Sequence, residues 1–297
     1  MKVLNYGSLN YDYTYKVSHM VRLGETLASS DMQLHCGGKG LNQSIALARA
    51  GVKVYHAGMI GRDGKELLDM CRIEGIDTGY IRECKDKSGH AIIQVDPQGE
   101  NCILLYGGAN QMNSLDQIEE VLKGFGEGDV LLFQNEINLI APLIDQAHNK
   151  GMRIVMNPSP FNEAVLECSL DKVSVFLLNE TEGYQISGKQ EPEEICSVLS
   201  ERFPRSEIVL TLGDKGVFYC AGELQLQIPA YSMPVVDTTA AGDTFTGYYL
   251  AGIIKGLEIS SALRRGCMAA ALAIGRKGAA ASIPMSAEVD SLLGFFD

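Results

Sequence analysis

Residues 41–75, LNQSIALARAGVKVYHAGMIGRDGKELLDMCRIEG, carry the alternation of elements that decides the fold. The apolar spacing predicts a helix over Leu41–Ala50, a strand over Val54–Met59 and a second helix over Lys65–Glu74. A glycine directly follows each predicted helix, which is the usual stop signal for a helix. A helix, a short apolar strand and another helix in succession are typical of α/β proteins with a parallel sheet.

The same alternation continues on both sides of this stretch. Apolar runs too short for helices predict buried parallel strands at Val3–Tyr6, Val130–Phe133, Ile154–Met156, Val175–Leu178 and Ile208–Leu212. A further helix is predicted over Ile140–Asn149, with Gly151 after it. We therefore expect one α/β domain over residues 1–297, with a doubly wound, mostly parallel sheet and helices on both faces.

Two segments depart from this alternation. The first, within residues 11–35, is polar and only weakly alternating. The second, at about 90–106, predicts a hairpin with strands at Ala91–Val95 and Cys102–Leu105 around the turn Asp96–Gly99, which has proline at its second position. We expect both segments to form one small β-sheet, inserted as a lid over the carboxyl edge of the main sheet, where ligands of such folds bind. Ordinary surface hairpins would explain the pattern equally well.

Composition and charge limit the possible function classes. With 46% apolar and 21% charged residues, the chain has the composition of a folded enzyme. Lys and Arg number 25 against 37 Asp and Glu, and this net charge of −12 argues against partners such as nucleic acid or a membrane surface. No apolar run approaches the ~20 residues that a membrane span needs, and no charged leader precedes an apolar segment. We expect a cytoplasmic protein.

The eight cysteines are too widely spaced for a zinc ribbon or a C-x-x-C pair. Even the nearest two, Cys71 and Cys84, are thirteen positions apart. Several cysteines lie in apolar runs, where a buried thiol packs as a small hydrophobic group. We therefore expect reduced thiols rather than a disulfide framework.

The common nucleotide-binding motifs are absent from the sequence. Gly64-Lys65 and Gly188-Lys189 are followed by Glu66 and Gln190, whereas a Walker A loop requires Ser or Thr at that position. The glycines around Lys39 lack the third glycine of the dinucleotide-binding fingerprint. These absences argue against a P-loop protein and against a dehydrogenase.

Asp237–Phe245, DTTAAGDTF, is the segment that points most directly to chemistry. The small residues Ala240, Ala241 and Gly242 at a helix start leave backbone N–H groups uncrowded, and these can bind the charge of a transferring phosphoryl group. Asp243 cannot bind phosphate, since like charges repel, but it can take a proton from a hydroxyl. The alternative is that Asp243 only caps the helix.

A second glycine-rich segment, CGGKGLNQS, covers Cys36–Ser44. Its three glycines allow a ligand to approach the backbone closely. Lys39 and Asn42 would supply hydrogen-bond donors for sugar hydroxyls or phosphate. On its own, the segment is equally consistent with a flexible turn before a helix.

Polar residues also follow several predicted strands. Asn10 and Asp12 come after the first strand and could hold two vicinal hydroxyls. Glu136 follows the strand at Val130–Phe133, and Asn179–Glu182 follow the strand at Val175–Leu178. Because the carboxyl ends of parallel strands meet at one edge of the sheet, we expect these side chains to converge there.

Two of these motifs resemble the signatures of the ribokinase-like (phosphofructokinase B) carbohydrate kinases. Gly37–Ser44, with Gly51 and Gly61 downstream, resembles the first signature, and Asp237–Asp243 resembles the second. The two occur in the order and at the separation seen in the family, and the resemblance covers nearly the whole chain. It implies a doubly wound α/β fold with a β lid.

The resemblance also implies roles for matching positions. Asp243 corresponds to the catalytic base, with Ala240, Ala241 and Gly242 as the anion hole. The sugar-contacting set corresponds to Asn10, Asp12, Gly38, Lys39, Gly40, Leu41, Asn42, Glu136 and Asp243. Asn179 and Glu182 match a motif associated with the nucleotide phosphates and Mg²⁺. The remaining nucleotide set corresponds to Thr211, Leu212, Gly213, Asp214, Lys215, Gly216, Gly242 and Cys267. A K⁺ site built largely from backbone carbonyls corresponds to Asp237, Thr239, Ala273, Arg276, Gly278 and Ser282.

The sequence departs from the family pattern at two of these positions. Cys267 stands where the family often has a nucleotide-contacting histidine, and a thiol would hold adenine more weakly. Tyr248 stands where the second signature usually has a small residue. Neither position touches the expected chemistry, but both leave the nucleotide preference open.

The expectation is therefore an ATP-dependent kinase that acts on the 5-hydroxyl of D-ribose, with Mg²⁺ and K⁺ as cofactors. A deoxyribose or nucleoside kinase of the same family is the alternative within the class. A sugar-binding protein without catalysis is the alternative outside it, although such a protein would have no need of Asp243 beside an intact Ala240–Gly242. Related kinases pair their lids, so we expect a homodimer joined through the lid.

Overall fold

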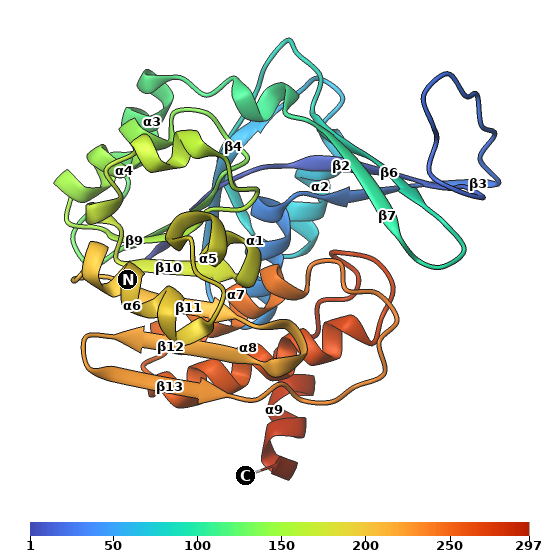
Figure 1. Cartoon of the computed structure of the whole chain (residues 1–297). Coiled ribbons are helices and arrows are strands. Elements are labelled where there is room, and N and C mark those ends of the chain that lie inside the picture. Colours follow the sequence, from blue (N-terminus) through green and yellow to red (C-terminus); the bar gives the residue numbers. More distant parts are fainter. Residues whose placement is uncertain (297) are drawn as a thin grey trace.

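The computed structural model describes residues 1–296, with side chains described up to Gly294. Its main element is a sheet of nine strands, covered by helices on both faces (Figure 1). In spatial order the strands are β13 (Leu224–Ile228), β12 (Val217–Ala221), β11 (Glu207–Thr211), β10 (Val175–Asn179), β9 (Arg153–Asn157), β8 (Val130–Gln134), β1 (Val3–Tyr6), β4 (Val54–Ile60) and β5 (Asp77–Glu83). The predicted doubly wound α/β fold is confirmed.

Seven of these strands, from β11 to β5, run parallel, and only β12 and β13 pair antiparallel. Every main-sheet strand predicted from residues 1–212 is present, with its ends shifted by at most one residue. The sequence did not predict β5, β12 or β13. In β13 most side chains are exposed, so this edge strand lacks the continuous apolar run by which the buried strands were recognised.

Consecutive side chains of the sheet enter two separate hydrophobic cores. In β8, Val130 and Leu132 enter one core, whereas Leu131 and Phe133 enter the other. The first core is covered by α1 (Lys39–Arg49), α2 (Lys65–Ile73), α7 (Ala241–Ile254), α8 (Ile259–Ile274) and α9 (Ser286–Phe296). The second is covered by α3 (Leu115–Leu122), α4 (Ile140–Asn149), α5 (Glu180–Ser187) and α6 (Pro192–Arg202).

A separate sheet of four strands projects from the side of the main body (Figure 1). It consists of β3 (Asp31–Gly37), β2 (Asn10–Lys16), β6 (Gly89–Val95) and β7 (Asn101–Tyr106), which we call the lid. The predicted hairpin β6–β7 is confirmed. The segment that the sequence left irregular contains β2 and β3, because β2 pairs with β3 on one side and β6 on the other.

The strand order reverses at β1, which lies between β8 and β4. Ligands of open α/β sheets bind at such a reversal. The chain leaves β1 and enters β2 after only three residues, and the first turn of α1 lies against this link. A side chain on Gly40 would overlap the backbone of Ser8, so only glycine permits this approach.

Helices α1 and α7 also approach each other closely. A Cβ on Gly247 would overlap Ala46 Cβ and would lie 2.8 Å from the backbone nitrogen of Leu47. The absence of a side chain at Gly247 therefore brings the two helices, each of which carries one signature at its N-terminus, into direct contact. Within residues 1–296, no helix is both long and apolar enough to cross a bilayer.

Candidate active site

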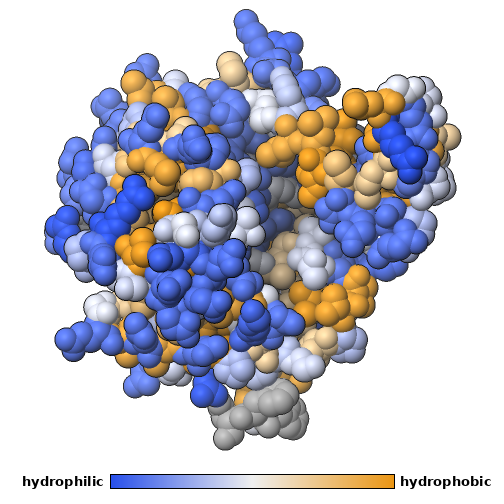
Figure 2. Space-filling view, in the orientation of Figure 1, coloured by the Kyte–Doolittle hydropathy of each residue, from blue (hydrophilic) through white to orange (hydrophobic). Residues whose placement is uncertain are grey.

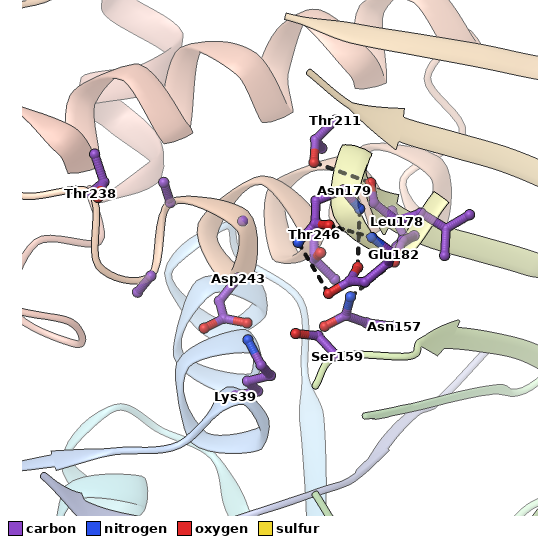
Figure 3. A pocket seen from close by; sticks show the side chains of 14 residues that line it. Lys39, Asn157, Ser159, Leu178, Asn179, Glu182, Thr211, Thr238, Asp243 and Thr246 are labelled. Atoms are coloured by element: carbon purple, nitrogen blue, oxygen red, sulfur yellow. Dashed lines mark hydrogen bonds between the residues drawn. The ribbon is translucent and has the colours of Figure 1, made fainter. Parts of the chain in front are cut away.

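A cavity of about 230 Å³ lies at the carboxyl edge of the main sheet (Figure 3). Its walls are formed by Lys39, Asn157, Ser159, Leu177, Leu178, Asn179, Glu182, Thr211, Thr238, Ala240, Ala241, Gly242, Asp243 and Thr246. Eight of these residues belong to the predicted site, and they come from both signatures and from two strand ends. Figure 2 shows a hollow between the lid and the main body on this side of the molecule.

The N-terminus of α7 forms one wall of the cavity. Ala240 precedes the helix in the left-handed conformation, with φ of 61°, which a residue with a side chain adopts only at a cost of roughly 1–3 kcal/mol. Ala241 and Gly242 begin the helix, and a Cβ on Gly242 would have no atom within 4 Å. The helix start is therefore open toward the cavity, as expected for an anion hole.

The carboxylate of Asp243 is 8% exposed and is held between two side-chain amides of α1. Asn42 Nδ2 donates to one of its oxygens at 3.1 Å, and Gln43 Nε2 donates to the other at 2.8 Å. Figure 3 shows Lys39 and Asp243 pointing toward one another across the cavity. The sequence predicted Asn42, Lys39 and Asp243 but not Gln43.

A chain of fully buried polar side chains stands behind Gln43. Gln134 Nε2 donates to Gln43 Oε1 at 2.6 Å and to Asn5 Oδ1 at 3.1 Å. Asn5 Nδ2 in turn donates to Ser44 Oγ at 2.8 Å, and Ser44 Oγ is 2.8 Å from His56 Nδ1. Burial lowers the pKa of His56 to about 4, so the chain ends in a neutral imidazole. Because each side chain in this hydrogen-bond network is held by the next, the network fixes the position of the Gln43 amide that binds Asp243.

Lys39 and Glu136 form a second polar group beside Asp243. Glu136 Oε2 accepts hydrogen bonds from Ser8 Oγ and from the backbone N–H of Lys39, the latter at 3.1 Å. Burial raises the pKa of Glu136, although the Lys39 charge opposes the change. Burial favours a lower pKa for Lys39, but the carboxylates of Asp243, Glu136 and Glu182 outweigh it and raise the pKa. Lys39 is therefore a positive charge among three acidic groups.

Asn10 and Asp12 lie at the base of the lid, on the same face of β2, and neither lines the cavity itself. The carboxylate of Asp12 occupies the space that a side chain on Gly37 would fill. It has no hydrogen-bond or ion-pair partner among residues 1–296. Burial, followed by the negative charges of Glu136 and Asp243, raises the pKa of Asp12 to about 7. Asp12 thus lies within electrostatic reach of the cavity.

The opposite wall of the cavity contains the N-terminus of α5. Asn179 and Glu182 form a capping box, in which Glu182 N donates to Asn179 Oδ1 at 2.8 Å and Asn179 N donates to Glu182 Oε2 at 3.0 Å. Asn157 and Ser159 from the end of β9 lie beside them. The sequence does not mark these two residues, because β9 is recognisable only as an apolar run and nothing in that run marks its end as functional.

Of the predicted nucleotide loop, only Thr211 lines the cavity. The loop continues through the short helix η4 (Gly213–Lys215), with Leu212 buried and Gly213 and Gly216 at positive φ. Cys267, which was also assigned to the nucleotide set, lies on α8 with its side chain buried in the hydrophobic core, and it is not in the cavity wall. Its contact with a nucleotide stays a prediction.

Three of the predicted cation-binding residues, Asp237, Thr239 and Gly278, are joined by hydrogen bonds next to α7. Asp237 Oδ1 accepts from Thr239 N at 2.9 Å and from Thr239 Oγ1 at 2.6 Å, and its Oδ2 accepts from Gly278 N at 2.9 Å. These hydrogen bonds lower the pKa of Asp237, although burial opposes them. The Arg276 side chain is paired with Glu288. Asp237 therefore joins the segment before α7 to the segment after α8.

Residues 1–286 match the model of the pfkB family carbohydrate kinases, and the chain belongs to this family. The ribokinase of Haemophilus influenzae is 34% identical over 292 residues, which cover 95% of each chain. The structure of ribokinase from Thermotoga maritima superimposes with a TM-score of 0.88 at 30% identity and 99% coverage of both chains. That of Arabidopsis thaliana ribokinase complexed with ribose and ATP gives a TM-score of 0.85 at 26% identity and 98% coverage of both.

The raised pKa of Asp12 predicts a pH-dependent cost of folding. The pKa of Asp12 is about 7 in the folded protein, against the usual 3.8. The contribution of this group to the free energy of unfolding is therefore fully present below pH 4 and is lost as the pH rises through 7. Asp12→Asn carries no such cost, so its melting temperature should exceed that of the native chain at pH 8 and approach it at pH 5. Each kcal/mol relieved corresponds to roughly 2–4 °C.

Thermal unfolding of the unliganded protein at both pH values measures this difference. Asp31→Asn is the control, because Asp31 lies in the same sheet but is exposed and paired with Lys16. That variant should show no gain at pH 8. An equal shift of Asp12→Asn at pH 5 and pH 8 would contradict the assignment.

Proposed function

We propose that this protein is an ATP-dependent kinase that transfers the γ-phosphoryl group to the 5-hydroxyl of D-ribose, giving ribose 5-phosphate. The observation that carries the proposal is the Asp243 carboxylate, held by two amides at the open N-terminus of α7. In the proposed site, the base and the anion site lie within one turn of the same helix. The full-length similarity to proteins named ribokinase supports ribose as the acceptor.

In the proposed reaction, Asp243 accepts the proton of the attacking hydroxyl as that oxygen bonds to phosphorus. The backbone N–H of Gly242 and, once it leaves its 3.3 Å contact with Thr238 O, that of Ala241 stabilise the negative charge on the transferring group, together with the positive end of α7. The Lys39 ammonium adds a positive charge beside the Asp243 carboxylate. Since phosphoryl transfer depends mainly on positioning and charge stabilisation, these groups account for most of the chemistry.

The residues around α5 fit a magnesium nucleotide. Carboxylate and amide oxygens and water are the ligands that Mg²⁺ prefers, and Glu182, Asn179 and Asn157 supply such oxygens to the cavity. Both oxygens of Glu182 already accept hydrogen bonds from Asn179, so contact with the ion would pass through water. When bound, Mg²⁺ would neutralise charge on the nucleotide phosphates.

The oxygen-rich loops at Asp237 and Gly278 fit a monovalent cation. The proposed K⁺ site is formed by Asp237, Thr239, Ala273, Arg276, Gly278 and Ser282, mainly through backbone carbonyls. Asp237 already connects the two loops, and Ala240 begins the anion hole only three residues further on. A cation bound there would fix the left-handed turn at Ala240 without touching the sugar.

The first test is a panel of pentoses, hexoses and nucleosides assayed with ATP, with Asp243→Asn beside the native chain. We expect D-ribose to be the best acceptor, and we expect the variant to bind it while kcat falls by roughly 10²–10⁴. Asp116→Asn is the matched control, because Asp116 lies in the first turn of α3 and does not line the cavity, so its loss should leave kcat unchanged.

Two results would contradict the proposal. A kcat for Asp243→Asn within a few-fold of the native value would reduce Asp243 to a helix-capping residue. Phosphorylation of a nucleoside or of deoxyribose in preference to ribose would replace the acceptor while keeping the reaction class.

Activation by K⁺ tests the cation site separately. We expect the rate in K⁺ to exceed that in Na⁺ or tetramethylammonium at equal ionic strength, because the site orders the anion hole. Asp237→Asn should raise the K⁺ concentration needed for half-maximal activation while leaving the KM for the sugar near its native value. Identical rates in the three salts would rule the site out.

We also propose that the protein forms a homodimer through the lid. The register places Tyr13, Leu34, Ile92 and Leu104 in one row, on the face opposite to Asp12. Leu104 is 67% exposed, and Leu34 and Ile92 are exposed as well. Apolar side chains exposed side by side on a small sheet mark an interaction surface.

Leu34→Lys combined with Leu104→Glu should therefore convert the dimer to a monomer, as measured by sedimentation at micromolar concentration. Leu224→Glu is the control, because Leu224 is also exposed but lies on β13, outside the lid. A native protein that sediments as a monomer would refute the proposal. Dissociation by the control variant would place the interface elsewhere.

A further inference from the structure

An asparagine outside the expected site lies directly beneath Asn10. Asn110 belongs to the short helix η1 (Gly108–Gln111), which follows the lid, and it is 1% exposed. Its Oδ1 accepts a hydrogen bond from the backbone N–H of Leu9 at 3.0 Å, and its Nδ2 donates to Asn10 Oδ1 at 2.6 Å. Both ends of the Asn110 amide are thus engaged by the segment that carries Asn10.

These contacts allow only one orientation of the two amides. A backbone N–H can only donate, so the atom of Asn110 that faces Leu9 is its oxygen. The NH₂ group of Asn110 then faces Asn10 and requires an acceptor there, which is Asn10 Oδ1. Consequently, Asn10 turns its own NH₂ group away from Asn110. That NH₂ group has no hydrogen-bond partner among residues 1–296, although Asn10 is only 2% exposed.

The surrounding structure maintains this contact. A Cβ on Gly89 would overlap both Asn110 Nδ2 and Asn10 Oδ1, so glycine at this position leaves room for the hydrogen bond between them. Asn113 Nδ2 donates to the backbone oxygen of Asn110 at 2.8 Å. Asn113 is itself fixed by Asn138, whose Oδ1 accepts from Asn113 Nδ2 at 3.0 Å.

We propose that Asn110 is a positioning residue that sets the hydrogen-bond polarity of the sugar site, fixing Asn10 as a donor beside Asp12 as an acceptor. The proposal rests on the proposed function, in which both side chains hold the sugar. Asn10 and Asp12 are two positions apart on β2 and lie on the same face of the lid. A bound sugar must therefore accept a hydrogen bond at one hydroxyl oxygen and donate one from a neighbouring hydroxyl.

This fixed orientation contributes to selectivity against deoxy sugars, because Asn10 cannot turn its NH₂ group toward Asn110 when the sugar hydroxyl is missing. A sugar that lacks the hydroxyl facing Asn10 leaves a buried NH₂ group without an acceptor. Sites built to hydrogen-bond a hydroxyl discriminate strongly against analogues without it, because the protein group remains unpaired. Discrimination between ribose and one of its deoxy analogues is then a property of Asn110 as well as of the residues that touch the sugar.

Asn110→Asp tests the proposal, because the new carboxylate can still accept from Leu9 N–H but offers no donor to Asn10. The Asn10 amide must then turn its NH₂ group toward the carboxylate and present its oxygen to the sugar. We expect the KM for D-ribose to rise at least ~10-fold, with kcat changed less than about threefold. The ratio of kcat/KM for D-ribose over 2-deoxy-D-ribose or 3-deoxy-D-ribose should fall by a similar factor.

Asn110→Ala is a second variant that introduces no buried charge. It frees Asn10 to adopt either orientation, so the same ratio should fall, but less than in Asn110→Asp. Asn113→Ala is the matched control: it removes support for η1 without touching Asn10, so it should lower the melting temperature and leave the ratio unchanged.

An unchanged ratio in both Asn110 variants would overturn the proposal, as would a loss of kcat at constant KM. An equal loss of the ratio in Asn113→Ala would show that any disturbance of η1 has the same effect, and would also overturn it. Failure of the proposed function has a different signature, since the native chain itself would then not phosphorylate ribose. In that case the same ratio is measured with the sugar that the native chain accepts and with its deoxy forms.

Discussion

The site depends on the contact between α1 and α7, two helices whose first turns are about 200 residues apart in the sequence. Gly247 allows the helices to touch, and at their N-terminal ends Asn42 and Gln43 of α1 hold both oxygens of Asp243 on α7. Without this contact the carboxylate would have neither a fixed position nor the neighbouring charge of Lys39. Two glycine-rich signatures that look independent in the sequence are therefore parts of one structural unit.

The electrostatics of the cavity follow from this arrangement. Asp12, Glu136 and Asp243 lie close enough to influence one another, and Lys39 supplies the charge that opposes them. Burial makes each unbalanced charge more costly, which is why the pKa values of Asp12 and Glu136 are raised. The site is in this respect destabilised in the absence of ligand. In the proposed function, sugar hydroxyls would donate hydrogen bonds to these carboxylates, and phosphate would pair with Lys39.

The fold could be predicted from local patterns because buried parallel strands are short apolar runs, and β1, β8, β10 and β11 have that form. Strand β2 could not, since its polar side chains are explained only by its two neighbours in the lid. The residues of the site also divide into those that a local sequence pattern marks and those that it does not. Lys39 and Asp243 stand in glycine-rich segments that mark them, whereas Asn110 and Asn157 carry no local signal. Their roles arise from contacts made across a hundred residues or more.

The base of the lid consists of one row of the small sheet, in which Asn10 is paired with Gly37 on one side and Gly89 on the other. Two of the three positions in that row have no side chain, so the sheet is thinnest where it joins the main body. A rotation of the lid would have this row as its axis. Atoms on an axis do not travel, and Asn10 would remain in place through opening and closing. Asp12, two residues further out, would swing with the lid, so one half of the proposed sugar site would be stationary and the other half would arrive only on closure.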